Sequence, residues 1–444
     1  MAQSHPTPAI QLIQKSDFTK QLIVPFTTPS AAPNLTVPNQ ALIRTRLVAL
    51  TTNNFTYARR GGIPYLAWWS VWPMPSPASS SSSSSSSLPP PFNDEAALAA
   101  YCRVSGWGCV EVVQSTVPGL AAGTWLAGYV PIGTRPEAVA LARGEVDGHW
   151  LRTDVVPGGE GLSSVYKRYV QVPGGKEGGG GGGMDKVGLG WDALMGVLFE
   201  TGFMLNRFVF SWEGEERVVH PLGMKGMRWA REDADIAGAV MVLLAPSGKT
   251  GLAFAHELRF GRPEGKRPGK VIAVGSARSR EFSAGTGLFD EVLLYEDLQD
   301  ASFDLGAKLG GQQQKIVVMD FGARGDAVDR WTEALKDRCE RLQVLVIGAD
   351  PLAQAQSKTA ERIEDATSGV EQVHAGNLRE RAIELVGTAK YYADKGTAWA
   401  KFKDDGTIPG LQLKWGKGME EFSEGWDALV RGDYGPDIGL VYEI

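Results

Sequence analysis

Cysteine is scarce in this sequence, and long apolar runs are missing from it. The 444 residues include three cysteines, an odd and sparse set that argues against a disulfide framework and fits a reducing compartment. No stretch approaches the roughly 18–20 uninterrupted apolar residues of a membrane helix, and the N-terminus lacks the basic and apolar segments of a secretory signal. The sequence therefore predicts a cytoplasmic protein without a membrane partner.

An excess of positive charge is also missing. The chain carries 45 Lys and Arg against 51 Asp and Glu, which gives a formal net charge of −6. This balance provides no electrostatic reason to expect nucleic acid as a partner. The hydrophobic content of 43% is that of an ordinary globular protein, and the length allows two or three domains, each with its own core.

The sequence also has no Cys, His or acidic residues at the spacing that metal ligands usually show. Catalytic zinc needs about three Cys, His or acidic ligands that converge on one site, and structural zinc typically needs four Cys. The five histidines are scattered, and Cys339 falls in a predicted helix at 328–342, in a different domain from Cys102 and Cys109. We therefore expect no metal site.

Low-complexity sequence interrupts the first half of the chain at two places, a serine run at 79–87 and a glycine-rich stretch at 174–183. Neither composition can bury a core, so both are expected to be surface loops. The sequence around them predicts an irregular, mostly β domain. Its predicted parts are a β-rich stretch at 41–61, two strands around a Pro-Gly turn within 109–130, and a strand at 169–173.

Strands and helices alternate from 239 to 350, which predicts a parallel sheet covered by helices on both faces. The predicted strands are 239–245, 270–276, 291–297, 315–322 and 343–350, and the predicted helices between them are 251–258 and 328–342. Further helices are expected at 191–210 and 419–432, with a final strand at 439–444. We predict a β-rich domain over 1–205, an α/β domain over 206–385, and a C-terminal segment over 386–444 that returns to the first domain.

The turn after the first strand of the α/β domain has the composition of a phosphate-binding turn. Ala245, Gly248 and Gly251 occupy the three small-residue positions of the Gly-x-Gly-x-x-Gly type of fingerprint, in a relaxed form, between a strand and a helix. Small residues let the backbone approach a phosphate, and the helix N-terminus adds N–H donors and a partial positive charge. The predicted site in this turn consists of Ala245, Ser247, Gly248, Lys249, Thr250 and Gly251. A glycine-containing turn without a ligand is the alternative.

The end of the second strand favours NADP(H) over NAD. An NAD site usually has an acidic residue there for the ribose hydroxyls, whereas this chain offers Ser276, Arg278 and Arg280, which can pair with a 2′-phosphate. The alternative is that the two arginines only solvate a loop. A P-loop is disfavoured, because the position of its first glycine is Leu243, inside the strand.

These residues resemble the medium-chain dehydrogenase/reductase superfamily, in particular its zinc-free quinone and enoyl reductases. Within it, the chain looks like a set of fungal and bacterial relatives known mainly as a domain of unknown function. The matching segments are Ala49–Asn54 with Tyr57, Gly108–Pro131, Arg168–Pro173 and Gly287–Tyr295. The resemblance implies a GroES-like β-rich barrel domain and a Rossmann-type, doubly wound parallel sheet. The turn departs from the usual pattern at Pro246, Lys249 and Thr250.

The resemblance also implies site residues outside the turn. Asn54 and Tyr57 are the catalytic candidates, with a strand-end residue and a packed barrel tyrosine as the respective alternatives. Tyr295 follows the third strand of the cofactor domain, and Phe321, Gly322 and Gly348 end strands at the sheet edge where ligands bind in such folds. Four tryptophans of the first domain can line an apolar substrate pocket or pack in the core, namely Trp68, Trp69, Trp72 and Trp107.

Together these features predict an NADPH-dependent, metal-independent reductase of an enone, quinone or polyketide-like carbonyl compound, acting as a monomer or homodimer on a small apolar substrate. Two alternatives stay open. One is a non-redox isomerase, cyclase or lyase on the same scaffold. It is suggested by the departure of the glycine turn from the usual pattern of the superfamily. The other is a nucleotide-binding protein without turnover.

Overall fold

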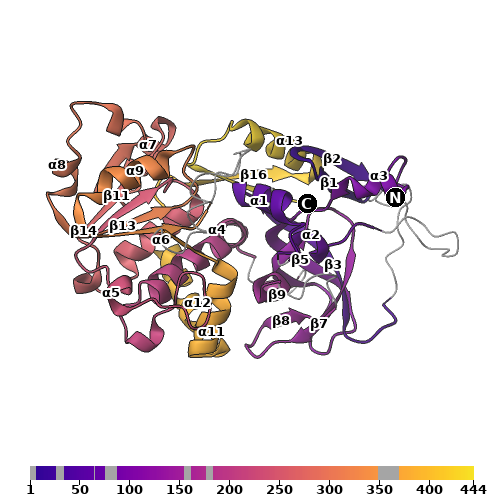
Figure 1. The fold of residues 1–444 in the computed structure, drawn as a ribbon. Coiled ribbons are helices and arrows are strands. Elements are labelled where there is room, and N and C mark those ends of the chain that lie inside the picture. Colours follow the sequence, from indigo (N-terminus) through magenta and orange to yellow (C-terminus); the bar gives the residue numbers. More distant parts are fainter. Residues whose placement is uncertain are drawn as a thin grey trace. The chain divides into compact units, whose positions relative to one another are not determined.

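The computed structural model describes residues 7–26, 35–64, 66–75, 88–154, 162–176, 184–348 and 370–444. The chain forms two compact units. Unit 1 comprises Met1–Leu194, Leu413–Tyr434 and Gly439–Ile444, and unit 2 comprises Met195–Gln412 and Gly435–Ile438 (Figure 1). The serine run at 79–87 and residues 177–183 of the glycine-rich stretch lie outside the described residues. Within the described ranges, no helix combines the length and apolarity that crossing a membrane requires.

The units differ from the predicted domain limits at two places. The division falls at Leu194, inside helix α4 (Lys186–Met204), rather than at 205. The return to unit 1 begins at Leu413 rather than at 386, because helix α12 (Thr388–Asp404) packs in unit 2. Its Tyr391 hydroxyl donates to the Glu200 carboxylate of α4, 2.8 Å away, and this buried contact joins the two helices.

Unit 1 is built on an antiparallel barrel. Its largest sheet has eight strands in the order β16-β17-β3-β5-β6-β9-β8-β7, and an additional pairing of β3 with β7 closes it. The bounds are β3 Gln40–Leu50, β5 Ser105–Ser115, β6 Thr124–Pro131, β7 Glu137–Arg143, β8 His149–Arg152, β9 Arg168–Lys176, β16 Gln412–Lys417 and β17 Ile438–Glu443. The predicted strand pair around the Pro-Gly turn is confirmed by β5 and β6, since Gly119 in the connection has the left-handed φ of 80°.

A second, three-stranded sheet in the order β2-β1-β4 completes the strands described in unit 1. Its strands are β1 Ala9–Gln14, β2 Asp17–Pro25 and β4 Tyr101–Cys102, and the unit's helices are α1 Thr52–Arg60, α2 Trp68–Val71, α3 Glu95–Ala99, the 3-10 turn η1 Ser164–Lys167, the first part of α4, and α13 Gly418–Arg431. The helix predicted at 419–432 and the final strand are thus confirmed.

The prediction of a β-rich stretch over 41–61 is wrong in its second half, because α1 replaces the strand from Thr52 onward. A capping box starts this helix. The Thr51 hydroxyl accepts from the backbone of Asn53, and the Asn54 side chain accepts from the backbone of Thr51 at 2.9 Å. Such reciprocal bonds satisfy N–H groups that a helix start leaves without partners, and they outweigh the β propensity of the threonines.

Unit 2 contains a six-stranded, all-parallel sheet in the order β12-β11-β10-β13-β14-β15. The strands are β10 Val240–Leu244, β11 Lys270–Gly275, β12 Glu291–Leu294, β13 Gln313–Asp320, β14 Cys339–Val346 and β15 Val370–Gln372. Counted along the sheet, this is the order 3-2-1-4-5-6 of a Rossmann-type fold. Every residue of β10 is buried, as expected for a strand covered on both faces. The predicted doubly wound sheet is confirmed.

Helices cover this sheet, and further helices join unit 2 on either side of it in the sequence (Figure 1). Their bounds are α5 Arg231–Ala234, α6 Lys249–Phe260, α7 Ala277–Gly285, α8 Leu305–Leu309, α9 Ala327–Lys336, α11 Ala375–Val386 and α12, with short turns η2 Leu205–Val209, η3 Glu215–Arg217, η4 Glu264–Lys266 and η5 Asp297–Gln299. On one face, Trp331 of α9 is fully buried among the valines of β10, β13 and β14.

Cys339 lies in β14, so its predicted placement in a helix is wrong. Helix α9 ends at Lys336, and the backbone of Gln313 in β13 donates to Arg338, which draws the following residues into the sheet. Cys339 pairs directly with Gln313 in the parallel register. The sheet bonds therefore override a sequence whose charged residues continue the helical pattern.

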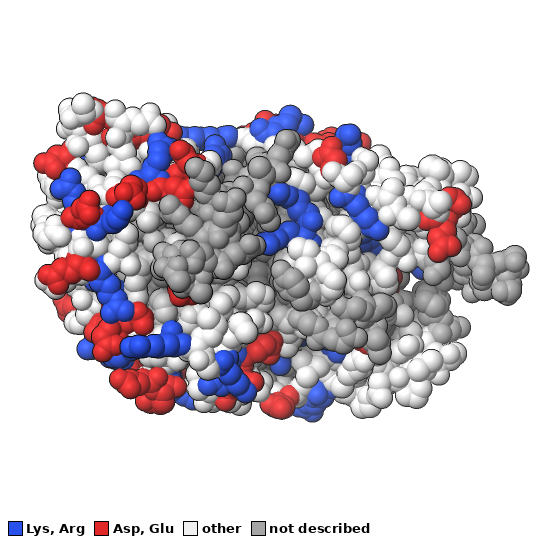
Figure 2. Space-filling view, in the orientation of Figure 1, with Lys and Arg blue, Asp and Glu red and all other residues white. Residues whose placement is uncertain are grey.

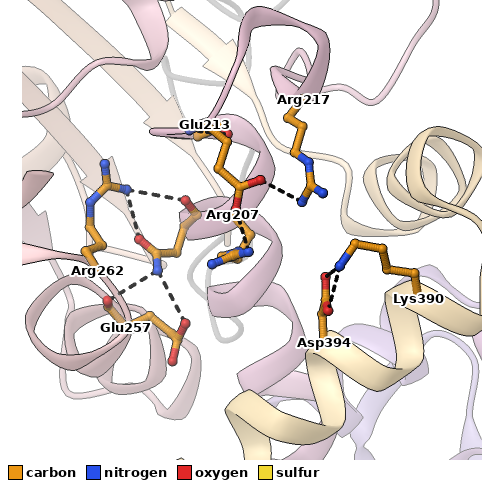
Figure 3. A network of polar contacts seen from close by, with 9 residues as sticks. Arg207, Glu213, Arg217, Glu257, Arg262, Lys390 and Asp394 are labelled. Carbon is orange, nitrogen blue, oxygen red and sulfur yellow. Dashed lines mark hydrogen bonds and ion pairs between the residues drawn. The ribbon is translucent and has the colours of Figure 1, made fainter.

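A π-turn after α4 is held by a polar network around Arg262 (Figure 3). The Arg262 guanidinium donates to the Asn206 side chain at 3.0 Å and to the Phe210 carbonyl at 2.7 Å, and the Asn206 amide donates to Glu257. Burial lowers the pKa of Arg262 to about 10. The network satisfies carbonyl groups that the widened turn leaves without helical partners, so we assign it a structural role.

Charged side chains of both signs are interspersed over the described residues of the face drawn in Figure 2. Ion pairs along helices occur among the described residues, for example Lys390 with Asp394 at 2.8 Å (Figure 3). Mixed charge of this kind creates no extended field of one sign.

Candidate functional site

The candidate site is built on a sharp backbone turn between β10 and α6. Ala245 adopts φ 53°, a left-handed conformation that is uncommon for a residue with a side chain. Its N–H donates to the Val274 carbonyl of β11 at 3.0 Å, and the Gly248 N–H donates back to the Ala245 carbonyl at 3.3 Å. The chain therefore turns sharply at the carboxyl end of β10 and enters α6 at once.

The two glycines of the turn have different roles in the structure. A Cβ on Gly251 would lie 2.8 Å from the backbone of Pro246, so only glycine lets the first turn of α6 pack this closely on the loop. Gly248 is exposed, and a Cβ there would make only an ordinary contact, 3.6 Å from the Ala245 carbonyl. Gly248 is also the N-cap of α6 and provides no capping side chain, so a ligand can reach the helix start.

The structure directs the Lys249 side chain away from the role that the sequence suggested for it. Its ammonium donates to the carbonyls of Pro436 and Ile438, at 2.9 and 2.8 Å, and so holds the C-terminal segment of unit 2. Burial lowers the pKa of this ammonium to about 8. The neighbouring turn residues Ser247 and Thr250 are half-buried at the start of the helix.

Replacing Lys249 with methionine is expected to lower stability and to leave cofactor affinity nearly unchanged. The variant keeps the aliphatic stem but leaves two carbonyls without their donor, which costs about 1–3 kcal/mol. We expect a lower denaturation midpoint in urea and an NADPH Kd within about threefold of the wild type. A large loss of affinity at unchanged stability would instead show that the ammonium binds a phosphate.

The end of β11 lies beside the turn, because Leu244 and Val274 are paired in the sheet. Ser276 is the N-cap of α7, and its carbonyl accepts from the Ser279 hydroxyl at 3.0 Å. Arg278 and Arg280 follow in the first turn of α7 and are exposed. No acidic residue occurs between Gly275 and Arg280, so this corner of the site carries hydroxyl and guanidinium donors.

Strand ends on the other side of the turn bring three further predicted residues together. The Phe321 N–H donates to the Leu244 carbonyl at 3.1 Å, and the Gly348 N–H donates to the Asp320 carbonyl at 3.2 Å. The Asp320 carboxylate accepts from the Gly322 backbone at 2.9 Å. Phe321, Gly322 and Gly348 therefore lie at the carboxyl edge of the sheet next to the β10–α6 turn, where the strand order reverses between β10 and β13.

Tyr295 does not join this group. Its side chain is 6% exposed and belongs to the hydrophobic core of unit 2, and its carbonyl lies 3.4 Å from the Trp331 indole nitrogen. The position after β12 points inward, where an aromatic ring fills the space between β12 and α9. The structure therefore gives Tyr295 a packing role.

The residues that remain fit a dinucleotide. A sharp turn with a close-packed Gly251 and an open Gly248 can present backbone N–H groups to a diphosphate. Ser276, Arg278 and Arg280 offer donors to a phosphorylated ribose on the β11 side. Residues at the ends of β13 and β14 provide backbone on the side of the second nucleotide.

The catalytic candidates of unit 1 lie in helix α1 and are buried. Both ends of the Asn54 amide are used in the fold, because it accepts from Thr51 and donates to the Ser105 carbonyl at 3.3 Å. Tyr57 is 2% exposed, and its hydroxyl accepts from Asn53 and Trp107. Asn54 thus caps a helix, and Tyr57 packs inside unit 1.

Tyr57 is the centre of an aromatic cluster whose other members are Trp68, Trp107, Tyr129 and Tyr166. Trp107 and Tyr166 are half-buried, whereas Tyr57 and Tyr129 are enclosed. Burial, together with the neighbouring phenols, raises the pKa of Tyr57 well above its usual range. Tyr166 had no signal in the sequence, since its position next to Tyr57 depends on strand pairing far along the chain.

Across the parts of the chain that the structure describes, no three or more His, Cys, Asp or Glu side chains are arranged to hold a metal ion. His256 lies within α6 and packs against Phe402, with ring centroids 4.7 Å apart.

A family model described as a protein of unknown function (DUF2855) matches residues 48–435. The chain belongs to this family. The matched stretch begins within β3 of unit 1 and continues past the whole of the six-stranded sheet, so the DUF2855 family shares both units. No curated protein is significantly similar to the chain in sequence.

Solved structures share the fold of this DUF2855 chain over nearly its full length. One is CurA from Vibrio vulnificus in complex with NADPH, with TM-score 0.50, 10% identity, and 98% of each chain covered. Another is the mitochondrial 2-enoyl thioester reductase Etr1p/Etr2p heterodimer from Candida tropicalis, with TM-score 0.53, 12% identity, and coverage of 99% of this chain and 100% of that one. The Etr1p complex with NADP and crotonyl-CoA matches similarly, with TM-score 0.52, 11% identity, and the same coverage. The chain therefore shares the fold of these solved structures over both units.

Proposed function

We propose that this protein is an NADPH-dependent oxidoreductase that reduces a small apolar enone, quinone or polyketide-like carbonyl compound. The observation that carries the proposal is the glycine turn of Ala245–Gly251 at the strand-order reversal of a parallel sheet, next to a β11 end that has basic side chains and no acid. The fold neighbours support it, because CurA is described with NADPH and Etr1p with NADP and crotonyl-CoA.

NADPH, when bound, supplies a hydride. The chain's own residues then have separate tasks. Backbone N–H groups of the turn bind the diphosphate, with Gly248 leaving the room for it. Ser276, Arg278 and Arg280 bind the 2′-phosphate, and residues at the ends of β13 and β14 orient the nicotinamide half.

The test is oxidation of NADPH at 340 nm by the purified protein with a panel of enones, quinones and β-keto thioesters. We expect turnover with at least one conjugated compound and slower turnover with NADH. A compound converted equally well without any nucleotide would contradict the proposal in favour of an isomerase, cyclase or lyase. Binding of NADPH without oxidation by any member of the panel would favour a protein without turnover.

Arg278 provides a test of the cofactor preference. Replacing it with alanine is expected to weaken NADPH binding about tenfold and to leave NADH binding unchanged, because a charge-assisted bond to phosphate contributes about 1.5–3 kcal/mol and NADH lacks that phosphate. The matched control is Arg338→Ala, an exposed arginine directly before β14, at the opposite edge of the sheet. An equal loss of affinity for NADPH and NADH would indicate that Arg278 acts through its charge on both nucleotides and does not contact the 2′-phosphate.

A further inference from the structure

A loop of unit 2, residues 220–227, packs directly against the start of helix α11. The His374 N–H, immediately before α11, donates to the Pro221 carbonyl of the loop at 3.1 Å. Gly223 has a left-handed φ of 67°, and a Cβ at this position would collide with the backbone of the first turn of α11. The loop and the helix start are therefore in backbone contact, and we call this contact the loop–α11 junction.

Two histidines of the junction use the same ring atom in the same way. The Leu222 backbone N–H donates to Nδ1 of His220 at 3.1 Å, and the Asn377 backbone N–H donates to Nδ1 of His374 at 3.1 Å. A backbone N–H is only a donor, so each Nδ1 has to be an unprotonated acceptor, which a charged imidazolium cannot provide. The second of these bonds is the N-terminal cap of α11, made by a histidine where serine or asparagine is usual.

Acid acts on both of these bonds. A proton on Nδ1 replaces the acceptor with a donor that faces another donor, and at His374 the new charge also faces the partial positive charge of the α11 N-terminus. Burial lowers the pKa of His220 and of His374, so each ring takes up a proton less readily in the folded protein than in the unfolded chain. Such a group contributes stability above its unfolded pKa, and this contribution is lost as pH falls below about 6.5.

Charged groups around the two rings do not reverse this direction. Glu371 of β15 lies 3.4 Å from Nε2 of His220, which carries the proton in the neutral ring and can donate to it. Burial raises the pKa of Glu371, which weakens its negative charge in the acid range. The Asp233 carboxylate of α5 favours a charged His220, but Arg341 pairs with that carboxylate. For His374, burial outweighs the opposing effect of its own backbone hydrogen bond.

A second attachment of the loop is insensitive to mild acid. Lys225 of the loop pairs with Glu384 of α11 at 3.1 Å, and Arg381 pairs with the same carboxylate at 3.0 Å. The bonds from these two cations lower the pKa of Glu384, so its carboxylate stays charged while the histidines titrate. A cavity of about 170 Å³ is lined by residues of both attachments, Asn377 and Lys225 among them. Water can therefore reach the helix cap.

We propose that the loop–α11 junction is an acid-sensitive switch, in which neutral His220 and His374 hold the loop on α11 and their protonation releases this end of the loop. Lys225 keeps the other end attached to α11. The loop carries two exposed methionines, Met224 and Met227, so its release rearranges an apolar part of the surface of unit 2. The switch is independent of the proposed cofactor site, because it involves neither the β10–α6 turn nor the carboxyl edge of the sheet.

Hydrogen–deuterium exchange of the full chain at pH 7.5 and pH 5.5, corrected for the intrinsic pH dependence of amide exchange, tests the proposal. In the wild type, the protection of amides 222–227 and 375–378 should fall between about tenfold and 100-fold at pH 5.5. The reason is that, one unit below the ordinary histidine pKa of about 6.5, keeping each ring neutral costs a factor of about ten. The amides of β10 should keep their protection at both pH values.

Asparagine gives matched variants, because its side-chain oxygen accepts the same backbone N–H groups but does not titrate. In the double variant His220→Asn with His374→Asn, protection of the junction should change less than about twofold between the two pH values, whereas each single variant should still lose about tenfold. His256→Asn in α6, which changes a histidine outside the junction, is the control and should keep the wild-type pH dependence.

Equal protection of the junction at both pH values in the wild type overturns the proposal. A double asparagine variant that loses as much protection as the wild type overturns it too, because the pH dependence would then come from other groups. A loss of protection that extends equally to β10 also contradicts it, since this would be general acid unfolding of unit 2 and not the release of one junction.

Discussion

The Gly248→Ala variant is expected to bind NADPH about 100-fold more weakly than the wild type while melting at the same temperature. The reason is that an added methyl group at Gly248 would meet little on the protein side but would block the solvent side. Toward the protein, an added methyl group makes only an ordinary contact, 3.6 Å from the Ala245 carbonyl. Toward solvent, it occupies the space at the helix start that a diphosphate needs. Charge-assisted bonds contribute about 1.5–3 kcal/mol each, so losing one or two of them gives an effect of this size.

Two matched variants separate binding from folding. Gly251→Ala should lower both the melting temperature and NADPH affinity, because its Cβ would lie 2.8 Å from the Pro246 backbone and force the turn apart. Gly396→Ala in α12 has open space around its Cβ and should change neither, or raise stability slightly. Calorimetric titration and thermal melts give both quantities for each variant. Wild-type affinity in Gly248→Ala would contradict the placement of the diphosphate at this turn.

Removing the Glu200 carboxylate is expected to cost about 3–5 kcal/mol of unfolding free energy, the largest stability loss that we predict. Glu200 and Arg379 are each 2% exposed, and the carboxylate accepts from the Arg379 guanidinium and the Tyr391 hydroxyl, both at 2.8 Å. In Glu200→Ala the guanidinium stays buried without its counter-charge. Because α4, α11 and α12 meet at this point, the loss should reduce the urea midpoint of unit 2.

The control for this prediction is Asp394→Asn, which breaks an exposed ion pair with Lys390 on α12 (Figure 3). Such pairs contribute about 0–1 kcal/mol, so this variant should unfold nearly as the wild type does. A double variant, Glu200→Leu with Arg379→Met, replaces the buried pair by apolar side chains and should recover much of the loss. Equal urea midpoints for Glu200→Ala and Asp394→Asn would show that the buried pair contributes little.

The same carboxylate should make stability depend on pH in the acid range. Burial alone would raise the pKa of Glu200, but the charges of Arg379 and Lys395 hold it at about 2, below the ordinary value of 4.5. A group whose pKa is lower in the folded state contributes stability that is complete above its unfolded pKa and is lost as pH falls toward the folded pKa. Wild-type stability should therefore decline between about pH 4.5 and 2, and Glu200→Gln should lack that part of the decline.

The parallel sheet and its turn could be predicted from the sequence because their signals are local. The five strands predicted in unit 2 each contain a short apolar run, whereas β15 (Val-Glu-Gln) has none and was not predicted. The glycines of the turn lie directly between the run of β10 and a helical pattern. The C-terminal helix α13 was equally clear, since its apolar residues recur at helical spacing. The secondary structure of such segments can be inferred from about a dozen neighbouring residues.

Other features depend on partners that are distant in the sequence. Lys249 has the composition of a phosphate ligand, yet it binds carbonyls at Pro436 and Ile438 near the C-terminus. Tyr166 has no motif around it, and only the pairing of β5, β6 and β9 brings its ring next to Tyr57. Helix α1 was missed for a different reason, because its capping box sits in a stretch of β-favouring residues.

The central claim is that unit 2 binds a phosphorylated dinucleotide at the Ala245–Gly251 turn, and a calorimetric titration of the purified protein with NADPH tests it most directly. The account predicts one site per chain, a Kd in the micromolar range or below, and weaker binding of NADH because NADH has no phosphate for Ser276, Arg278 and Arg280. No heat of binding with NADPH at millimolar concentration, or equal affinity for both nucleotides, would contradict it.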